Sequence, residues 1–497
     1  MKDKIILWLG TNLTYFGLAK SLQDKYDCDL FAIVDITAKP KKFFQEQEIV
    51  RFKKIWFYHD HIHKNHIVDV KYLQVFEEKY KINLWLLAQN ERIFYRFNQF
   101  HKFSSDEILS ILEQECKLFE QVLDEAKPDF LMIYMPTLHQ IQLFYELSKA
   151  RGIKILVLRS TPFGYRYMIT QQAEKIHNNS MITNNNTRSY EDLLSYLKEY
   201  DSFKQGNDFL SEFQNSNLQY FKAIIKFFFT SYSNVKSHYT YYGRSKIRVL
   251  SKMLVYTIKK KSREYFMKKN LITQINDQSP FVYFPLHIEQ EQVLLISAPF
   301  YTNQIEIIRH VTKSLPVGYK LFVKEHPVMS TRGWRSISEY KEIMQIPNVV
   351  LIHPSLKSEN LIKKSSLVIT INGTSSIEAA FYKKPSIMFA NTDNSYLSFI
   401  EHVESIDELP KIIRKSLNKE ISIERLNQYV DFIVKNSFEL DLGGLENKVT
   451  NYFYFGGFLV DTEIYVDSMK KFLKDNETPL NILADEFIKR LSVLKQT

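Results

Sequence analysis

Three polar side chains follow a short apolar run in the segment Lys324-Glu325-His326-Pro327. The apolar run, Tyr319 to Val323, is typical of a buried strand, and Pro327 ends that strand and fixes the turn after it. Open α/β sheets bind their ligands at the carboxyl ends of the strands. The pattern therefore predicts a binding site at this edge of a sheet, although a single His-Pro pair is a weak signal by itself.

A second chemical pattern lies further along the chain, where the apolar run Leu367 to Ile371 leads into Asn372-Gly373 and then Thr374-Ser375-Ser376. These hydroxyl residues begin a predicted helix, whose unpaired N–H groups and positive dipole end attract a phosphate. Taken alone, an ordinary helix cap explains the segment better. Its occurrence in the same predicted sheet as the Lys-Glu-His-Pro turn favours an anion site.

The first part of the chain alternates short apolar runs with stretches of helical spacing, which predicts a parallel βαβ sheet. The expected strands are 5–9, 30–34, 84–87, 130–134 and 155–158. The loop from Gly10 to Gly17 follows the first of them and lacks a full GxGxxG, so we expect no dinucleotide site there.

A second alternation begins near Phe281, with helices expected at Gln304–Leu315 and Ser375–Tyr382. Its expected strands are 281–286, 293–298, 319–323, 349–352, 367–371 and 386–389. The predicted domains are an N-terminal α/β domain at 1–170, a basic helical insertion at 171–278, a C-terminal α/β domain at 279–420 and a helical tail at 421–497. The tail could cap the second α/β domain or cross back to the first.

The composition is that of packed, water-exposed domains. The chain has 66 Lys and Arg against 56 Asp and Glu, a net charge of +10, and 45% hydrophobic residues. These values exclude a mainly disordered or fibrous chain. The first apolar run is too short for a signal peptide, and no run of about 18 apolar residues occurs, so we expect a cytoplasmic protein without a membrane span.

Neither a disulfide framework nor a metal site is expected. The two cysteines, Cys28 and Cys116, belong to no CxxC or Cys/His cluster. Four histidines cluster after an aromatic run but alternate with polar residues in a predicted loop, where the spacing shows no converging ligand set. These are His59, His61, His63 and His66.

The positive charge is concentrated in one block. Residues 221–270 hold 13 Lys and Arg against the single acid Glu264, whereas the rest of the chain has a net charge of −2. The block also carries aromatic runs, including 227–229 and 239–242, so it fits an arm on an anionic membrane surface. A solvated helical hairpin and nucleic-acid binding are the alternatives, and no nucleic-acid-binding module accompanies the block.

The motifs of the second half resemble those of the bacterial capsule polysaccharide biosynthesis family, which includes 3-deoxy-manno-octulosonic acid transferases. The residues that carry the resemblance are Phe284-Pro-Leu-His287 with Glu289, Lys324–Pro327, Pro347-Asn-Val349, Asn372–Ala379 and Lys384-Pro385. The resemblance covers about residues 280 to 400, and the first domain matches only in type. It implies an α/β fold of the GT-B class, in which two Rossmann-like domains face each other and the C-terminal one binds the donor nucleotide.

The resemblance also implies roles for the motif residues. In related CMP-sugar transferases a His-Pro pair binds CMP and hydroxyls at a helix start bind its phosphate. By this likeness His326 and Pro327 would contact the nucleotide, and Glu325 would accept from ribose hydroxyls. The phosphate would be held by the segment Gly373, Thr374, Ser375 and Ser376. Glu378 is a second ribose candidate or a first-turn acid, and Lys324 is a phosphate counter-charge or a solvated lysine.

Such a transferase also needs a group that deprotonates the acceptor, and the candidates at predicted strand ends are Glu91, His139 and Asp35. Each also has a structural explanation. Glu91 could pair with a nearby arginine, His139 could be a histidine at a helix start, and Asp35 could be a cap. Glu91 and His139 rank above Asp35. Arg159 and Arg166 could bind an acidic acceptor or the donor carboxylate.

The prediction is a glycosyltransferase that moves a CMP-activated ulosonic acid, octulosonic or nonulosonic, onto a bacterial cell-surface glycan or glycolipid. It would need no metal or cofactor and would lie in the cytoplasm at the inner face of the membrane, bound through 221–270. The alternatives are a CDP-alditol phosphotransferase of the teichoic-acid type and a non-catalytic assembly protein that binds glycan or nucleotide.

Overall fold

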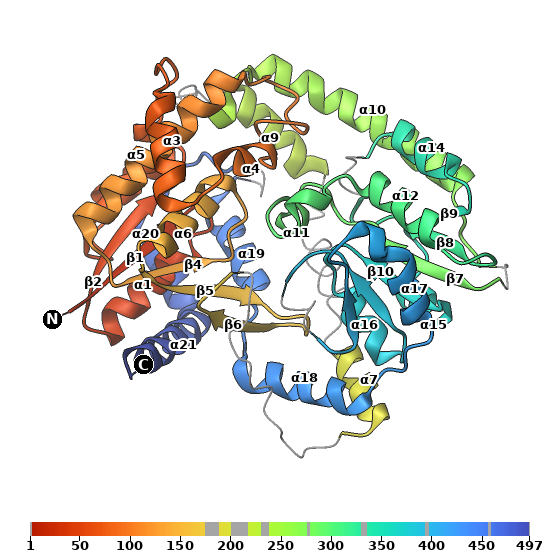
Figure 1. Ribbon diagram of the computed structural model, residues 1–497. Coiled ribbons are helices and arrows are strands. Elements are labelled where there is room, and N and C mark those ends of the chain that lie inside the picture. Colours follow the sequence, from red (N-terminus) through yellow and green to blue (C-terminus); the bar gives the residue numbers. More distant parts are fainter. Residues whose placement is uncertain are drawn as a thin grey trace. The chain divides into compact units, whose positions relative to one another are not determined.

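The computed structural model describes residues 2–173, 188–199, 217–229, 238–275, 279–329, 335–392, 397–455 and 459–496 (Figure 1). The chain divides into two compact units. Unit 1 comprises Met1–His177, Asp201–Lys246 and Asn436–Thr497, and unit 2 comprises Asn178–Tyr200 and Ile247–Lys435.

Unit 1 is built on a seven-stranded sheet of order β13-β6-β5-β4-β1-β2-β3. Its strands are β1 (Asp3–Leu9), β2 (Cys28–Val34), β3 (Phe52–Phe57), β4 (Phe130–Tyr134), β5 (Lys154–Ser160), β6 (Arg166–Thr170) and β13 (Phe438–Glu439). The first five run parallel, and β6 and β13 are antiparallel additions. The parallel part has the doubly wound order 3-2-1-4-5, which is Rossmann-like.

Helices cover both faces of this sheet, as the alternation of buried side chains along β1 requires. Leu7 points to one face and Trp8 to the other. The Leu7 face is covered by α1 (Thr14–Lys25), α2 (Ala38–Glu46), α19 (Leu442–Phe453), α20 (Val466–Asp475) and α21 (Glu477–Gln496). The Trp8 face is covered by α3 (Val70–Tyr80), α4 (Leu84–Gln89), α5 (Ser105–Ala126) and α6 (His139–Ala150).

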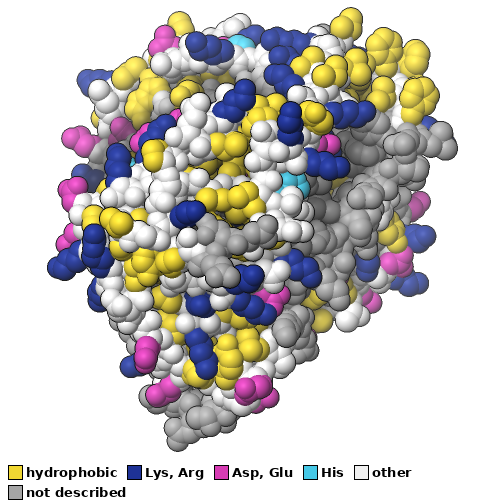
Figure 2. All heavy atoms as spheres, turned by 90° about the vertical axis from the view of Figure 1, so that its right-hand side faces the viewer, with side chains coloured by type: hydrophobic (Ala, Val, Ile, Leu, Met, Phe, Trp, Pro, Cys, Tyr) yellow, Lys and Arg dark blue, Asp and Glu magenta, His cyan; other side chains and the backbone are white. Residues whose placement is uncertain are grey.

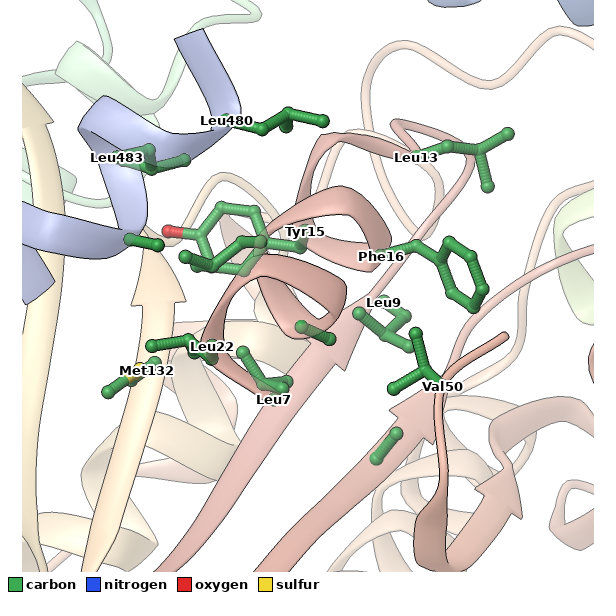
Figure 3. Packing of buried hydrophobic residues seen from close by; sticks show 14 of the residues in the cluster. Leu7, Leu9, Leu13, Tyr15, Phe16, Leu22, Val50, Met132, Leu480 and Leu483 are labelled. Carbon is green, nitrogen blue, oxygen red and sulfur yellow. The ribbon is translucent and has the colours of Figure 1, made fainter. Parts of the chain in front are cut away.

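The end of the tail packs on unit 1. Figure 3 shows Leu480 and Leu483 of α21 beside α1, with Tyr15 projecting from that helix. A Cβ at Gly17 would lie 2.6 Å from Leu480 Cδ2, so the glycine lets the two helices approach closely. The tail was expected either to cap the second α/β domain or to cross back to the first. Its first helix, α18 (Ile423–Asn436), lies almost wholly in unit 2, and the helices after it belong to unit 1.

Unit 2 is built on a six-stranded parallel sheet of order β12-β11-β10-β7-β8-β9. Its strands are β7 (Phe281–Pro285), β8 (Lys320–Lys324), β9 (Val349–Ile352), β10 (Leu367–Thr370), β11 (Ser386–Met388) and β12 (Ile400–His402). Its connecting helices include α11 (Gln292–Leu295), α12 (Gln304–Ser314), α14 (Ile337–Gln345), α15 (Ser358–Lys364), α16 (Ser375–Phe381) and α17 (Leu409–Leu417). The order is the classical 3-2-1-4-5-6 of a Rossmann sheet.

The predicted fold class, two Rossmann-like α/β domains with helical additions, is confirmed, while the facing of the two domains stays a prediction. Two expected strands are wrong. Residues 84–87 form α4, because the Asn83 side chain accepts the Leu86 N–H and caps a helix. Residues 293–298 hold most of α11 instead of a strand. Short apolar runs of this kind do not distinguish a buried strand from a buried helical turn.

The basic block is divided between the units. Unit 1 contains α9 (Asn217–Phe229) and the short helix Tyr239–Tyr241, and unit 2 contains all but the first residue of α10 (Lys246–Asn270). Tyr239 and Tyr242 are core residues of unit 1, so the aromatic run 239–242 is not part of an exposed arm. Lys236 lies outside the described residues. Within the described residues no helix is both long and apolar enough to cross a membrane.

Candidate functional site

The motif residues of unit 2 follow strands on both sides of the point where its strand order reverses. The chain moves from β7 to β8 on one side and from β10 to β11 on the other, so the loops after β7 and β10 diverge. Ligands of open α/β sheets bind in the crevice outside such a switch point. His287 follows β7, the Lys-Glu-His-Pro turn follows β8 and the Gly373 loop follows β10.

The ring of His287 holds the Gly373 loop in place. Its Nε2 accepts the backbone N–H of Asn372 at 3.3 Å and lies 3.2 Å from Thr370 Oγ1. Burial lowers the pKa of His287 to about 4, which keeps the ring neutral at pH 7. A Cβ at Gly373 would lie 2.9 Å from Thr370 Oγ1 and 3.2 Å from His287 Nε2, so only glycine fits without a shift. The sequence motif contains His287 but gave it no role.

The three hydroxyl side chains after Gly373 have different surroundings. Thr374 Oγ1 donates to Glu378 Oε1 at 2.9 Å, and the buried Ser376 Oγ donates to the Gly373 carbonyl at 2.8 Å. Ser375 Oγ makes no hydrogen bond to any described residue. Ser376 therefore holds the loop together, and Ser375 is the hydroxyl that remains available to a ligand.

The helix that these residues begin, α16, has only seven residues. Its dipole is thus a weaker source of positive potential than the sequence pattern suggests. A buried lysine supplies the charge instead. The side chain of Lys324 is 2% exposed and its Nζ lies 2.9 Å from Ser358 Oγ. Burial lowers the pKa of Lys324 to about 8, although Glu378 and Glu325 act in the opposite direction.

Glu325 supports the turn from inside the domain. Its Oε1 accepts the backbone N–H of His326 at 2.7 Å, and its Oε2 accepts from Arg335 Nε at 2.7 Å and from the Tyr340 hydroxyl at 2.8 Å. Arg335 also binds Glu289 at 2.8 Å. Glu325 is fully buried, so these contacts assign it to positioning and correct the expected ribose contact. No motif in the sequence pointed to Arg335.

His326 itself stands at the strand end, half-buried and followed by Pro327. Its Nδ1 accepts the backbone N–H of Val328 at 3.3 Å. In a neutral ring this bond places the proton on Nε2, which makes Nε2 the hydrogen-bond donor of the ring.

In unit 1, Glu91 and His139 are brought together, but in a closed network. His139 Nδ1 lies 2.9 Å from Glu91 Oε2, and Nε2 lies 3.0 Å from Glu115 Oε1. Burial disfavours the charged ring, yet Glu115 and Glu91 raise the pKa of His139 to about 10. Tyr58 donates to Glu115 as well. Because both ring nitrogens carry protons that are already donated, His139 cannot act as a base in this state.

Asp35, the third candidate, follows β2 and keeps a 15% exposed side chain. Its Oδ1 lies 2.9 Å from His59 Nε2, and its Oδ2 accepts from Gln140 at 3.2 Å. Burial raises the pKa of Asp35, but His59, Gln140 and His238 together lower it, and the net shift is downward. The His59 ring stacks on His238 at a centroid distance of 3.5 Å. Contacts thus favour Asp35 over Glu91 and His139, the reverse of the order expected from the sequence.

The two arginines expected to bind a carboxylate have protein partners. Arg166 Nη1 lies 2.7 Å from Glu439 Oε1, and Nε donates to Ser437 Oγ at 2.8 Å, which ties β6 to the segment around β13. Arg159 Nη1 donates to the Ala173 carbonyl at 3.2 Å. Arg166 therefore binds a carboxylate of the protein itself, and its expected role toward a substrate stays a prediction.

The histidine cluster that follows β3 does not form a ligand set. His59 pairs with Asp35, whereas His66 faces Glu113. Across the part of the chain that the structure describes, no three His, Cys, Asp or Glu side chains are placed to hold a metal ion. Cys28 and Cys116 are free thiols.

No curated protein matches this chain. The solved structure of KpsC, a β-Kdo 2,7 transferase from Thermosulfurimonas dismutans, is 9% identical over 66% of this chain and 83% of that one, with a TM-score of 0.31. UDP-GlcNAc 2-epimerase from Methanocaldococcus jannaschii is 13% identical over 87% and 100%, with a TM-score of 0.24. MnaA of S. aureus with UDP is 11% identical over 86% and 91%, with a TM-score of 0.26.

A family model also matches. It is that of the capsule polysaccharide biosynthesis proteins, and its match contains the loops after β7, β8 and β10. The resemblance predicted from the motifs is therefore confirmed: residues 186–392 match the capsule polysaccharide biosynthesis family.

Proposed function

We propose that this protein is a glycosyltransferase that moves a CMP-activated ulosonic acid, octulosonic or nonulosonic, onto a cell-surface glycan or glycolipid. The observation that supports the proposal is the buried Lys324, which ends β8 at the same sheet edge as His326 and Ser375. The Ser375 hydroxyl has no hydrogen-bond partner among the described residues. A buried cation and hydrogen-bond donors at strand ends suit the phosphate of a nucleotide.

In this reaction the bond between the anomeric carbon of the sugar and the phosphate oxygen breaks, and CMP leaves with one more negative charge on its phosphate. Lys324 and Ser375 would meet that charge as it develops, and His326 Nε2 would donate to the nucleotide. His287 would keep the Gly373 loop in place by accepting the backbone N–H of Asn372. All of these groups belong to unit 2.

The other half of the reaction joins an acceptor oxygen to the anomeric carbon, and the acceptor proton must pass to a base. We assign that role to Asp35, because its side chain keeps some exposure and its pKa lies below the ordinary value, so it is ionised at neutral pH. Glu91 and His139 would be structural. Chelating agents should leave transfer unchanged, because no step of this scheme uses a metal.

The proposed setting is the cytoplasm at the inner face of the membrane. The partners would be the nucleotide sugar, a glycan or glycolipid acceptor and the anionic membrane surface itself. Nucleic acid is not among them.

The test is a comparison of donors. The protein is incubated with CMP-activated ulosonic acids or with CDP-glycerol and an acceptor glycan, and the product is weighed by mass spectrometry. Addition of one ulosonic acid residue supports the proposal. Addition of glycerol phosphate would instead establish the CDP-alditol phosphotransferase, and CMP binding without any turnover of donor would establish a binding protein.

A further inference from the structure

We propose that one face of α10 lies flat on an anionic lipid bilayer and docks unit 2 there. The proposal deepens the membrane partnership put forward above by naming the surface that makes it. It rests on the charge and exposure of α10 and is tested by lipid binding alone. The docking proposal can therefore fail while the proposed glycosyl transfer stands, and the proposed glycosyl transfer can fail while the docking proposal stands.

Four large hydrophobic side chains form a stripe along α10. Ile247, Leu254, Ile258 and Tyr265 are 75%, 69%, 69% and 70% exposed. At about 100° of rotation per residue, the intervals of seven, four and seven residues keep all four within about 40° around the helix axis. At about 1.5 Å per residue the stripe is about 27 Å long.

The opposite face of α10 anchors the helix to unit 2, so the stripe is held outward by packing. Arg263 and Met267 are 4% and 2% exposed. Met267 belongs to the hydrophobic core of unit 2, and the Phe266 ring stacks on Tyr340. Arg263 Nη1 lies 3.5 Å from the Arg335 carbonyl.

Positive charge borders the stripe. From Lys246 to Asn270 the helix has nine Lys or Arg and one acid, Glu264, which faces Lys260 at 3.8 Å. Lys261, Lys268 and Lys269 project within about 60° of the stripe. Figure 2, which faces the side of Figure 1 where α10 ends, shows hydrophobic and Lys or Arg side chains interspersed along its upper part.

This combination selects the occupant. A hydrophobic stripe between lysines matches the boundary between acyl chains and anionic headgroups, where the apolar side chains enter and the amines stay at the phosphates. A second copy of the same face would bring like charges together, and a nucleic acid would leave the isoleucines and leucine without partners. The bilayer is therefore the occupant to which we commit.

The experiment measures co-sedimentation of the full chain with phosphatidylcholine vesicles that contain or lack phosphatidylglycerol. The test variant is Leu254→Glu/Ile258→Glu, which places charge in the centre of the stripe without touching Arg263 or Met267. We expect the wild type to bind only the anionic vesicles and the variant to bind at least about tenfold more weakly. Salt should weaken the binding of the wild type.

The matched control is Phe300→Glu/Val317→Glu, because these side chains are 81% and 106% exposed on unit 2 outside α10. It makes the same change of charge and should bind within about twofold of the wild type. Circular dichroism verifies that both variants are folded. Equal binding by the wild type and the stripe variant overturns the proposal, and so does a loss of the same size in the control.

Two further outcomes would assign the face to another partner. If the wild type is dimeric by analytical ultracentrifugation and the stripe variant is monomeric, α10 is an interface between copies. If single-stranded RNA abolishes vesicle binding and binds the stripe variant more weakly, α10 is a nucleic-acid surface. The last comparison uses Phe228→Glu/Phe229→Glu on α9. If only that variant loses vesicle binding, the docking site lies on unit 1.

Discussion

The Nε2 atom of His139 lies 3.0 Å from Glu115 Oε1 in the interior of unit 1, where the two side chains are 2% and 0% exposed. Glu91 binds the other ring nitrogen. The histidine is therefore held as an imidazolium between two carboxylates. Such a network is costly to break, because removal of one partner leaves a buried charge without a counter-charge.

Unit 1 should accordingly lose stability at high pH. The pKa of His139 is raised from 6.5 in the unfolded chain to about 10 in the folded one. The stabilisation is complete below about pH 6.5 and is lost as the pH rises toward about 10. Urea denaturation across this range should show the decline for the wild type, and His139→Gln should be less stable at neutral pH by about 3 to 5 kcal/mol.

The control for this prediction is His101→Gln, because His101 pairs with Glu107 at a half-exposed position. It should change stability by about 1 kcal/mol or less. If the wild type and His139→Gln show the same pH dependence, His139 is neutral in the folded protein and the network is not charged.

The affinity for CMP should depend on the protonation of Lys324. Its pKa is about 8, so the amine is mostly charged at pH 7 and loses its proton as the pH rises through about 8. Binding should weaken as the pH rises past about 8. Lys324→Met should remove this dependence and cost about 2 kcal/mol of binding at neutral pH. Lys320→Met, at the other end of the same strand, should retain the wild-type profile, and a pH-independent wild type would refute the assignment.

The Gly373 loop should not tolerate a side chain. In Gly373→Ala the new Cβ would lie 2.9 Å from Thr370 Oγ1 and 3.2 Å from His287 Nε2, so the loop or the ring must move. We expect CMP affinity to fall about tenfold, which corresponds to about 1.4 kcal/mol. Gly443→Ala is the matched control, because its Cβ would have no neighbour closer than 4.0 Å. Calorimetry that finds equal affinity in both variants would show that the loop does not contact the nucleotide.

Removal of Arg335 should destabilise unit 2. Its guanidinium is fully buried and binds both Glu325 and Glu289, so Arg335→Met leaves two carboxylates without a counter-charge. A loss of about 3 to 5 kcal/mol is expected in thermal or urea denaturation. The triple variant Arg335→Met/Glu289→Gln/Glu325→Gln should recover part of it. A single variant as stable as the wild type would mean that the cluster is not a charged network.

Much of the fold was predictable because its strands are buried on both faces. The run 130–134 has the bounds of β4, since a continuous apolar run between turn signals suits a central parallel strand. The run 349–352 has the bounds of β9, which is apolar although it lies at the edge of its sheet. The run 84–87 failed because the Asn83 cap, and not hydrophobicity, decides its conformation. Strand β3 contains two exposed lysines, which hid it from the sequence pattern.

Local motifs revealed the turn and loop of the candidate site but not the groups behind them. Gly373, Ser375 and His326 could be named because each follows a strand and belongs to a short pattern. Glu115, in the middle of α5, and Arg335 act only through residues that folding brings to them. The sequence therefore assigned Glu325 to a ligand, whereas tertiary contacts assign it to the protein interior.

The central claim is that unit 2 binds the nucleotide of the donor, and titration calorimetry with CMP tests it most directly. The comparison uses the wild type, His326→Ala, Ser375→Ala and, as the matched control, Ser376→Ala, whose hydroxyl is bonded inside the loop. We predict that the wild type binds one CMP and that His326→Ala and Ser375→Ala each lose about 1 to 3 kcal/mol of binding. Ser376→Ala should lower the stability of the folded protein more than its affinity for CMP. A wild type that does not bind CMP, or unchanged affinity in folded His326→Ala and Ser375→Ala, would contradict the account.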